Sequence, residues 1–272
     1  MKIASSTWSF HPWLIDGRIT IRELIEKGRS LGLDGFEVVD IDLVDTSPAA
    51  MKEIGKYIEA NGMEISAMSL EHDLNQYTQG ERDADVDKVL RWMDYACMLK
   101  VKTLRVFTGW QKPFMTYLQQ VEYCKEGLRK IVKRAEENDI ILALENHNDV
   151  CKWGDEIVPL IKEINSPNLR TCIDTFNFAY SDALQKCNIT ENAYKQAEMM
   201  LPYIQNAHIK LTAFQENGED VNMDVGRLVK MFREHGYDDW WAIEFMWPSR
   251  DQYINIYEEI AKGTKLLRKY SK

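Results

Sequence analysis

Short apolar runs alternate with longer amphipathic segments along the whole chain of 272 residues, and this alternation limits the possible fold more than any other feature. The apolar runs are typical of strands buried on both faces, and the segments between them repeat their apolar residues at the spacing of a helix with one buried side. We expect strands at 2–8, 35–39, 63–70, 103–107, 140–144, 169–173, 204–211 and 240–243. We expect helices at 19–31, 48–61, 84–99, 115–138, 156–164, 190–201, 225–235 and 253–267.

Strand–helix units in this order predict an α/β protein with a parallel sheet, because parallel strands need a crossover helix between them. Eight units in about this length are the pattern of a (β/α)8 TIM barrel. The chain has no Gly/Ser-rich linker and no change of composition, so residues 1–272 are expected to form a single domain. The alternative is a doubly wound open sheet, but GxGxxG, the phosphate-binding turn expected after its first strand, is absent.

The charge and composition of the chain limit the kinds of molecule that it is expected to bind. The formal net charge is −9 and Lys and Arg form no run, which argues against a nucleic-acid surface. No apolar run approaches the ~20 residues of a membrane span, and the N-terminal MKIASSTWSF lacks the apolar core of a signal peptide. The five cysteines form no CxxC pair and suit free thiols in a reducing compartment. We expect a cytoplasmic protein that acts on a small molecule, binds neither nucleic acid nor membrane, and is free to form a homo-oligomer.

Four consecutive predicted strands deliver a side chain that can bind a metal ion. The apolar run 140–144 is followed directly by Glu145, and the next three strands end in or carry Asp174, His208 and Glu244. The C-terminal ends of barrel strands meet at one rim, so these side chains should converge. Three carboxylates at short range raise one another's pKa unless a cation is present. Oxygen ligands with one imidazole suit a single divalent ion, for which Mn²⁺ or Mg²⁺ fits best and Co²⁺ or Zn²⁺ is an alternative.

Other polar and aromatic residues at the same rim are candidates for binding the substrate. Sugar rings pack their C–H faces on aromatic side chains and leave their hydroxyl groups to polar ones. The aromatic candidates, each of which could instead pack between barrel and helices, are Trp8, Phe10, Trp13, Phe107, Trp110, Phe176 and Trp247. The residues predicted to contact the substrate are Glu37, His72, Trp110, His147, Asn177 and Lys210. For Glu37 and His72 the equal alternative is a structural role, as a salt-bridge partner and as a core histidine.

The cations near the rim bear on whether the substrate carries a phosphate. A barrel enzyme usually binds a sugar phosphate with the loops after its seventh and eighth strands. The first of these loops, 212–224, is acidic, and Lys210 and Arg250 are the only cations identified that could help. We therefore expect an unphosphorylated sugar or a polyhydroxy ketone. His11 and His235 are interpreted as a loop residue and a helix-end residue without a role.

Four segments resemble the xylose isomerase-like barrels, namely LENH at 144–147, IDTFN at 173–177, AHIK at 207–210 and AIE at 242–244. That family includes sugar isomerases and epimerases, among them the ketose 3-epimerases, as well as inosose dehydratases, dehydroshikimate dehydratases and endonuclease IV. The resemblance extends over the whole chain in the order of its elements. It implies that the four metal-ligand positions of the family are taken here by Glu145, Asp174, His208 and Glu244.

Two departures from the family pattern narrow the function. Asn177 stands where ketose 3-epimerases and endonuclease IV usually carry His, and the loop 212–224 lacks the Arg expected of the 3-epimerases. The same loop lacks the Asp-x-His pair that holds further zinc in the nuclease. The trinuclear nuclease site therefore cannot be assembled as it is in that relative, which agrees with the acidic charge of the chain.

Glu145 and Glu244 are expected to flank the substrate and to act as a proton pair as well as metal ligands. One would remove a proton from the carbon next to a carbonyl, and the other would return a proton from the opposite face. Reaction through the resulting enediolate is epimerisation, or isomerisation if the proton returns to the neighbouring carbon. We therefore predict a divalent-metal-dependent sugar isomerase or epimerase of carbohydrate metabolism. A dehydratase that expels a β-hydroxyl from the same enediolate, and a non-catalytic metal- or sugar-binding barrel, are the alternatives.

Overall fold

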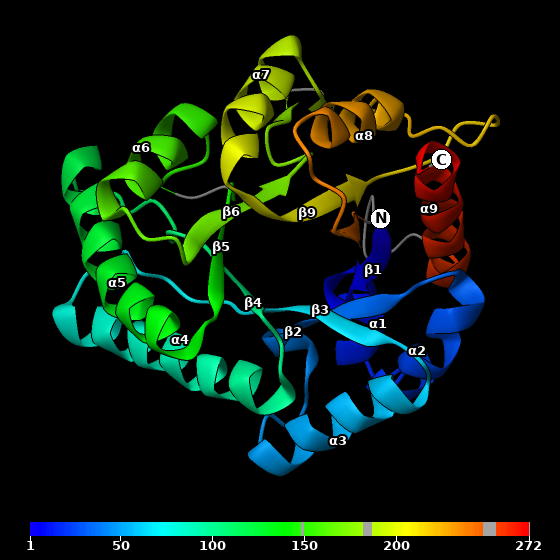
Figure 1. Cartoon of the computed structure of the whole chain (residues 1–272), viewed down its shortest axis with the longest axis horizontal. Coiled ribbons are helices and arrows are strands. Elements are labelled where there is room, and N and C mark those ends of the chain that lie inside the picture. The colour runs from blue at the N-terminus through cyan, green and yellow to red at the C-terminus, as the bar shows by residue number, and fades with distance from the viewer. Residues whose placement is uncertain (148–149, 182–186, 247–253, 272) are drawn as a thin grey trace.

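Each apolar run predicted as a strand pairs in parallel with the next such run, and the last pairs with the first to close a barrel (Figure 1). The computed structural model describes residues 1–147, 150–181, 187–246 and 254–271. The (β/α)8 barrel predicted from the alternation is therefore confirmed. In chain order its strands are β1 (Lys2–Ser6), β2 (Gly35–Val39), β3 (Glu64–Ser69), β4 (Thr103–Val106), β5 (Ile141–Glu145), β6 (Leu169–Asp174), β9 (Ile204–Leu211) and β10 (Trp240–Phe245).

A ring of helices covers the outside of the barrel, because each crossover returns the chain to the start of the next parallel strand (Figure 1). The apolar side of each helix packs on the strands, so one continuous core lies between the two layers. No helix in the described part of the chain is long and apolar enough to cross a membrane. The ring consists of α2 (Ile21–Gly28), α3 (Pro48–Ala60), α4 (Gln79–Leu99), α5 (Tyr117–Asn138), α6 (Gly154–Ile164), α7 (Glu191–Met200), α8 (Val225–Glu234) and α9 (Ile256–Tyr270).

Side-chain caps determine where several helices begin, and one of them corrects a predicted boundary. Helix α4 was expected from residue 84, but it begins at Gln79 because Thr78 and Glu81 form a capping box around its first turn. The first residues of α4 are polar and show no apolar spacing, so periodicity alone could not reveal them. Thr20 and Glu23 cap α2 in the same way.

The loops at the C-terminal rim contain short elements that have no sequence period and were not predicted. After β1 the chain forms a 3-10 turn, η1 (Thr7–Phe10), and a single helical turn, α1 (His11–Ile15). After β2 it forms another 3-10 turn, η3 (Asp40–Asp42). Between β6 and α7 lies a small antiparallel hairpin of β7 (Tyr180–Ser181) and β8 (Cys187–Asn188). Two further 3-10 turns, η2 (Arg29–Leu31) and η4 (Leu201–Tyr203), lie at the other end of the barrel, between a helix and the strand that follows it.

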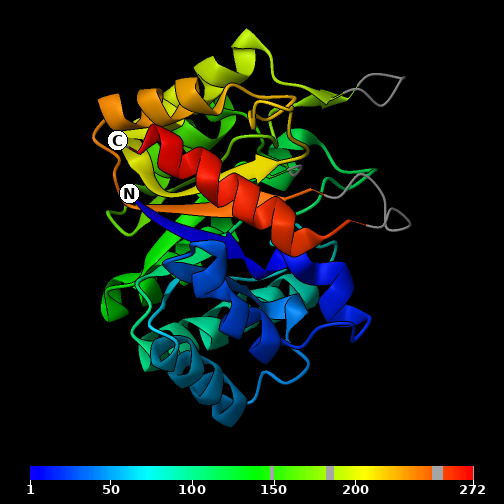
Figure 2. The same cartoon turned by 90° about the vertical axis from the view of Figure 1, so that its right-hand side faces the viewer.

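The strand register brings the predicted ligands to one end of the barrel. Glu145 and Asp174 are the last residues of β5 and β6. Asp174 pairs with His208 of β9, and Glu244 of β10 pairs with Lys210 of β9. Both chain ends lie at the opposite end of the barrel (Figure 2). The rim that carries these residues is therefore formed entirely by the loops that follow the strands.

Candidate active site

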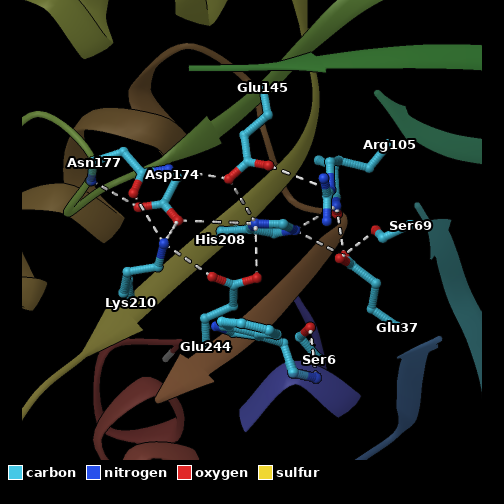
Figure 3. A network of polar contacts seen from close by, with 12 residues as sticks. Ser6, Glu37, Ser69, Arg105, Glu145, Asp174, Asn177, His208, Lys210 and Glu244 are labelled. Atoms are coloured by element: carbon cyan, nitrogen blue, oxygen red, sulfur yellow. Dashed lines mark hydrogen bonds and ion pairs between the residues drawn. The ribbon is translucent and has the colours of Figure 1, made fainter. Parts of the chain in front are cut away.

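The four side chains predicted as metal ligands meet inside the C-terminal end of the barrel (Figure 3). His208 Nδ1 lies 3.5 Å from Glu145 Oε1, 3.6 Å from Glu244 Oε1 and 4.0 Å from Asp174 Oδ2. All four residues are buried, with no more than 5% of any of them exposed. Three carboxylates and one imidazole nitrogen thus face one another away from bulk water.

This arrangement fits a divalent cation. His208 Nδ1 is fully buried and makes no hydrogen bond to any described residue, although carboxylate oxygens surround it. Candidate ligand atoms of Glu145, Asp174 and His208 all lie within 4.8 Å of one another. An orphaned ring nitrogen among carboxylates is satisfied by a cation, and a donor set of this kind suits Mn²⁺ or Mg²⁺. The residues present could therefore hold the ion that the sequence predicted.

Glu37 holds His208 from the side opposite the cluster. Its Oε2 lies 2.8 Å from His208 Nε2, and its carboxylate also accepts hydrogen bonds from Ser69 Oγ at 2.6 Å and Asn206 Nδ2 at 2.9 Å. Burial raises the pKa of Glu37, but the charges of His208 and Arg105 outweigh it and hold that pKa below its usual value. A carboxylate at Nε2 assigns the ring proton to that nitrogen and leaves Nδ1 as the ligand.

Glu37 and His72 were predicted to contact the substrate, and the structure places neither in the wall of the cavity. Glu37 is completely buried behind His208, so it acts on the imidazole and not on a ligand. The His72 ring stacks on Phe107 with centroids 4.6 Å apart, and Nδ1 lies 3.2 Å from the carbonyl oxygen of Leu70. Nε2 accepts a hydrogen bond from the Phe107 amide at 3.4 Å. His72 is therefore a core histidine, which was the alternative interpretation.

Lys210 and Asn177 were predicted to bind the substrate, and both line the cavity. Lys210 Nζ lies 2.8 Å from Asp174 Oδ2 and 3.1 Å from Glu244 Oε2, and it donates a hydrogen bond to Asn177 Oδ1 at 2.9 Å. Burial lowers the pKa of Lys210, but Asp174 and Glu244 outweigh it and keep the ammonium charged. Asn177 Nδ2 donates to Glu145 Oε1 at 3.1 Å. The two residues therefore orient three of the four predicted ligands.

Asp174 is held rigidly by its own loop. Its Oδ1 accepts the backbone amides of Phe176 and Asn177, each at 2.9 Å. The Asn146 side chain makes two hydrogen bonds to the backbone of Asp174: Oδ1 accepts one from the amide at 2.7 Å, and Nδ2 donates one to the carbonyl oxygen at 3.0 Å. Burial and the nearby Glu244 and Glu145 raise the pKa of Asp174, against the charge of Lys210. Asn146 of the LENH segment and the backbone of the DTFN segment therefore position the carboxylate of Asp174.

Arg105 is a site residue that the sequence analysis missed. It lies in the middle of β4, is 4% exposed, and its Nε is 3.3 Å from Glu145 Oε2. Burial lowers its pKa, but Glu145, Glu37 and Glu71 outweigh that effect and keep the guanidinium charged. Burial also raises the pKa of Glu145, yet Arg105 and His208 hold it well below the usual value. The sequence could have indicated it, because Arg105 lies inside a predicted buried strand and a buried charged residue needs a partner of opposite charge.

A cavity of about 820 Å³ opens above the cluster. Its wall contains Glu145, Glu244 and Arg105, and also the predicted contacts Trp110, His147, Asn177 and Lys210. Among the aromatic candidates Trp8 and Phe176 line it as well. Phe10 and Phe107 are instead buried in the core, Trp13 does not line the cavity, and Trp247 lies outside the described residues.

Trp110 and His147 form an aromatic side of the cavity. The His147 ring stacks on Phe107 with centroids 5.0 Å apart and forms a T-shaped pair with Trp110 with centroids 5.3 Å apart. Asn75 Nδ2 donates to the Trp110 carbonyl at 2.8 Å and fixes this loop. Gly109 precedes Trp110 at φ +109°, where a Cβ would clash with Asp73. The half-exposed indole is thus positioned by a well-anchored turn.

Two charged residues of the cavity wall, Lys152 and Glu71, were not predicted from the sequence. Lys152, in the loop after β5, lines the cavity and was not among the predicted cations. Burial lowers its pKa, against the charges of Asp174 and Glu156. Glu71, after β3, adds a further carboxylate to the wall, and burial raises its pKa. Arg250, the other predicted cation, lies outside the described residues.

The family model of the xylose isomerase-like TIM barrel matches residues 25–270 of the chain. The chain belongs to this family. Among similar solved structures, a D-psicose 3-epimerase in the presence of D-fructose is 18% identical with a TM-score of 0.78, and the match covers 100% of both chains. An L-ribulose 3-epimerase is 15% identical with a TM-score of 0.78, covering 100% of this chain and 94% of that one. A 3-keto-D-glucoside 4-epimerase from E. coli is 15% identical with a TM-score of 0.76, covering 99% of each.

At these identities the solved structures establish the shared barrel, and several of them are sugar epimerases. Within this xylose isomerase-like barrel, the carboxylates of Glu145 and Glu244 face the same cavity from β5 and β10. Two positioned carboxylates beside a cation site can remove and return protons on a bound ligand. The site thus has the groups for proton-transfer chemistry.

Proposed function

We propose that this xylose isomerase-like barrel is a divalent-metal-dependent sugar isomerase or epimerase that moves a proton on the carbon next to a carbonyl. The observation that carries the proposal is the placement of Glu145 and Glu244, whose Oε1 atoms lie 3.5 and 3.6 Å from His208 Nδ1 within one buried cluster. Both carboxylates also line the cavity, so both can reach a ligand bound there.

Glu145, Asp174, His208 and Glu244 would hold one divalent ion, with Mn²⁺ or Mg²⁺ favoured by their donor atoms. When bound, such an ion polarises a carbonyl oxygen and stabilises the negative charge that develops on it. Glu37 supports this role because, with the ring proton on Nε2 held by Glu37, Nδ1 would be available to the ion when it is bound.

The proposed proton pair is oriented by the residues around it. Asn177 donates to Glu145 Oε1 and Arg105 lies beside Glu145 Oε2, so this carboxylate is held at both oxygens. Lys210 holds Glu244 through Oε2. One carboxylate takes the proton from the carbon next to the carbonyl, and the other delivers a proton to the opposite face. The fixed charges of Arg105 and Lys210 stabilise the enediolate that exists between the two transfers.

The cavity wall favours a neutral polyhydroxylated substrate. Trp8, Trp110 and Phe176 offer aromatic faces to the C–H groups of a sugar. Arg105 and Lys210 are already paired with buried carboxylates, whereas Lys152 makes no ion pair with any described residue. Glu71 adds a negative charge to the same wall. An unphosphorylated ketose or related polyhydroxy ketone therefore suits this wall better than a sugar phosphate.

The proposal is tested by incubating the Mn²⁺-loaded protein in D₂O with D-fructose, D-tagatose, D-psicose, L-ribulose and inososes. We expect NMR to show deuterium on the carbon next to the carbonyl and chromatography to show an epimer or isomer. Appearance of an ultraviolet-absorbing enone would instead identify a dehydratase. Binding of these compounds without deuterium incorporation would contradict an enzyme and favour a binding barrel.

A further inference from the structure

His11 stands in the cavity wall on the side away from Glu145. It follows β1, and β1 and β5 lie four places apart in the ring of eight strands, so they face each other across the barrel. The lining residues that follow or end β1 and β2 are Trp8, His11, Val39 and Ile41. Of these four described residues, His11 carries the imidazole, and the other three are aromatic or aliphatic.

A buried hydrogen-bonded chain fixes the His11 ring. Its Nδ1 lies 2.7 Å from Asp42 Oδ1, and Thr7 Oγ1 donates to Asp42 Oδ2 at 2.6 Å. Thr7 Oγ1 in turn accepts the Val39 amide at 3.0 Å. Asp42 and Thr7 are 5% and 1% exposed. The ring also stacks on Trp8, with centroids 4.6 Å apart. Since Nδ1 is engaged by Asp42, the ring would meet a ligand through Nε2.

The segment η1–α1, which carries His11, is hydrogen-bonded to β10, the strand that carries Glu244. Ser9 Oγ donates to the Ile243 carbonyl at 3.1 Å and accepts the Phe245 amide at 2.9 Å. These two backbone groups flank Glu244 on β10. The position of His11 is therefore fixed relative to one of the two carboxylates proposed to transfer protons.

We propose that His11 is a substrate-binding residue that accepts a hydrogen bond from a hydroxyl group on the part of the substrate that extends away from Glu145 and Asp174. A neutral imidazole whose Nδ1 donates to a carboxylate offers Nε2 as an acceptor, and a sugar hydroxyl is a matching donor. Trp8 packs against the C–H groups of the same part. Asp42 is the positioning residue that sets the ring orientation. This inference rests on the proposed function, because it assumes a polyhydroxylated ligand.

The test compares a full-length ketose with its reacting fragment. D-Fructose carries the distal hydroxyl groups, whereas dihydroxyacetone retains the carbonyl and its two neighbouring carbons and lacks the rest. The variant is His11→Asn, because the Asn amide can still donate to Asp42 from the Nδ1 position but has no group at the Nε2 position. His235→Asn is the matched control, since His235 lies on the exposed end of α8. Calorimetry gives Kd for both probes on Mn²⁺-loaded protein, and deuterium exchange in D₂O is followed in parallel.

We expect His11→Asn to weaken D-fructose binding by about tenfold, as for loss of one hydrogen bond, and to leave the Kd of dihydroxyacetone within about twofold. His235→Asn should change neither. Equal Kd values for D-fructose in wild type and His11→Asn would overturn the inference, as would failure of the wild type to bind D-fructose more tightly than dihydroxyacetone. Equal weakening of both probes would also overturn it, because it would indicate a general structural effect.

Deuterium exchange into dihydroxyacetone separates this inference from the proposed function. That exchange depends on the reacting end alone, so its absence in the wild type contradicts the proposed proton transfer while the binding comparison still decides the role of His11. The positioning role of Asp42 is tested with Asp42→Asn. We expect it to weaken D-fructose binding in the wild type, and to have no further effect on that Kd in the His11→Asn background. Additive effects in the double variant would contradict a role that acts through His11.

Discussion

His208 Nε2 lies 2.8 Å from Glu37 Oε2, so a fully buried carboxylate holds the imidazole from behind while Nδ1 faces Glu145, Asp174 and Glu244. The relationship links β2 and β9, which are separated in the barrel by β10 and β1 (Figure 3). Ser69 and Asn206 fix the carboxylate in turn. The orientation of the predicted metal ligand therefore depends on a residue that does not touch the cavity.

The first prediction is that Glu37→Gln weakens binding of Mn²⁺ by roughly 10- to 100-fold, the usual effect of removing an outer partner of a ligating histidine. The physical reason is that a neutral amide no longer favours the ring proton on Nε2. Calorimetric titration of the metal-free protein measures the change. Glu64→Gln, an exposed glutamate at the start of β3, is the control and should bind Mn²⁺ as the wild type does. Unchanged affinity in Glu37→Gln would show that Glu37 does not orient the ligand.

The second prediction is one divalent ion per chain. It follows from the candidate ligand groups found among the described residues, Glu145 with Asp174 and His208 and Glu37 with His208 and Glu244, which share His208 and so surround one position. Elemental analysis after Mn²⁺ loading and desalting should give about one ion. Two or three tightly bound ions, or no bound ion after loading, would contradict a single-metal site.

The third prediction concerns Arg105, whose guanidinium compensates Glu145 inside the barrel. Removing one partner of a buried ion pair leaves the other charge uncompensated, at a cost of roughly 3–5 kcal/mol. We expect Arg105→Met to lower the free energy of unfolding of the metal-free protein by about this amount, and to lower it less when Mn²⁺ is present to compensate Glu145. Urea denaturation with and without Mn²⁺ measures both values. Arg105→Lys, which keeps the charge, should lose less than Arg105→Met, and equal stability of Arg105→Met and wild type would refute the compensation.

The fourth prediction is a pH effect on stability from His72. Burial, as the largest cause, lowers the pKa of His72 from 6.5 to about 3. Between these two pH values His72 is protonated in the unfolded chain but not in the folded protein. The free energy of unfolding is therefore unaffected by His72 above about pH 6.5 and decreases as the pH falls from there toward 3. Between pH 7.5 and pH 5 the loss should be about 2 kcal/mol. Urea denaturation should show His72→Gln losing about that much less than the wild type over the same range, and equal losses would mean that His72 titrates normally.

The alternation of apolar and amphipathic segments predicted the barrel because every strand is buried on both faces and every helix on one. The same logic located Glu145, Asp174 and Glu244, since a residue at the C-terminal end of a barrel strand must lie at one rim. Short rim elements such as α1 could not be predicted, because a single helical turn has no period. The contact between His11 and Asp42 could not be predicted either, because the two residues are 31 positions apart and only folding brings their loops together.

Glu37 shows the limit of reasoning from strand ends. It is the third residue of β2 and not the last, so its side chain enters the barrel below the cavity and meets His208 from β9. Arg105 also lies within its strand, β4, but its side chain reaches the cavity wall, and its role becomes interpretable once Glu145 is seen beside it. Sequence position indicates which end of the barrel a residue occupies, whereas the depth of a side chain depends on the stagger of neighbouring strands. Irregularities such as the register shift between Thr171 and Cys172 alter that stagger.

The central claim is that Glu145 and Glu244 are a proton pair and not metal ligands alone, and the fifth prediction tests it with Gln at each position. Gln keeps the shape and an oxygen donor but loses basicity. We expect Glu145→Gln and Glu244→Gln to retain metal content near that of the wild type while turnover of the accepted ketose falls by roughly two to four decades.

The most direct measurement follows solvent deuterium in these two Gln variants, loaded with Mn²⁺ and checked for metal content. Because the two carboxylates serve opposite faces, each variant should still exchange deuterium into one epimer faster than it converts that epimer into the other, and the favoured epimer should differ between the variants. Near-wild-type turnover of either variant with its metal bound would contradict the account and leave that glutamate as a ligand only.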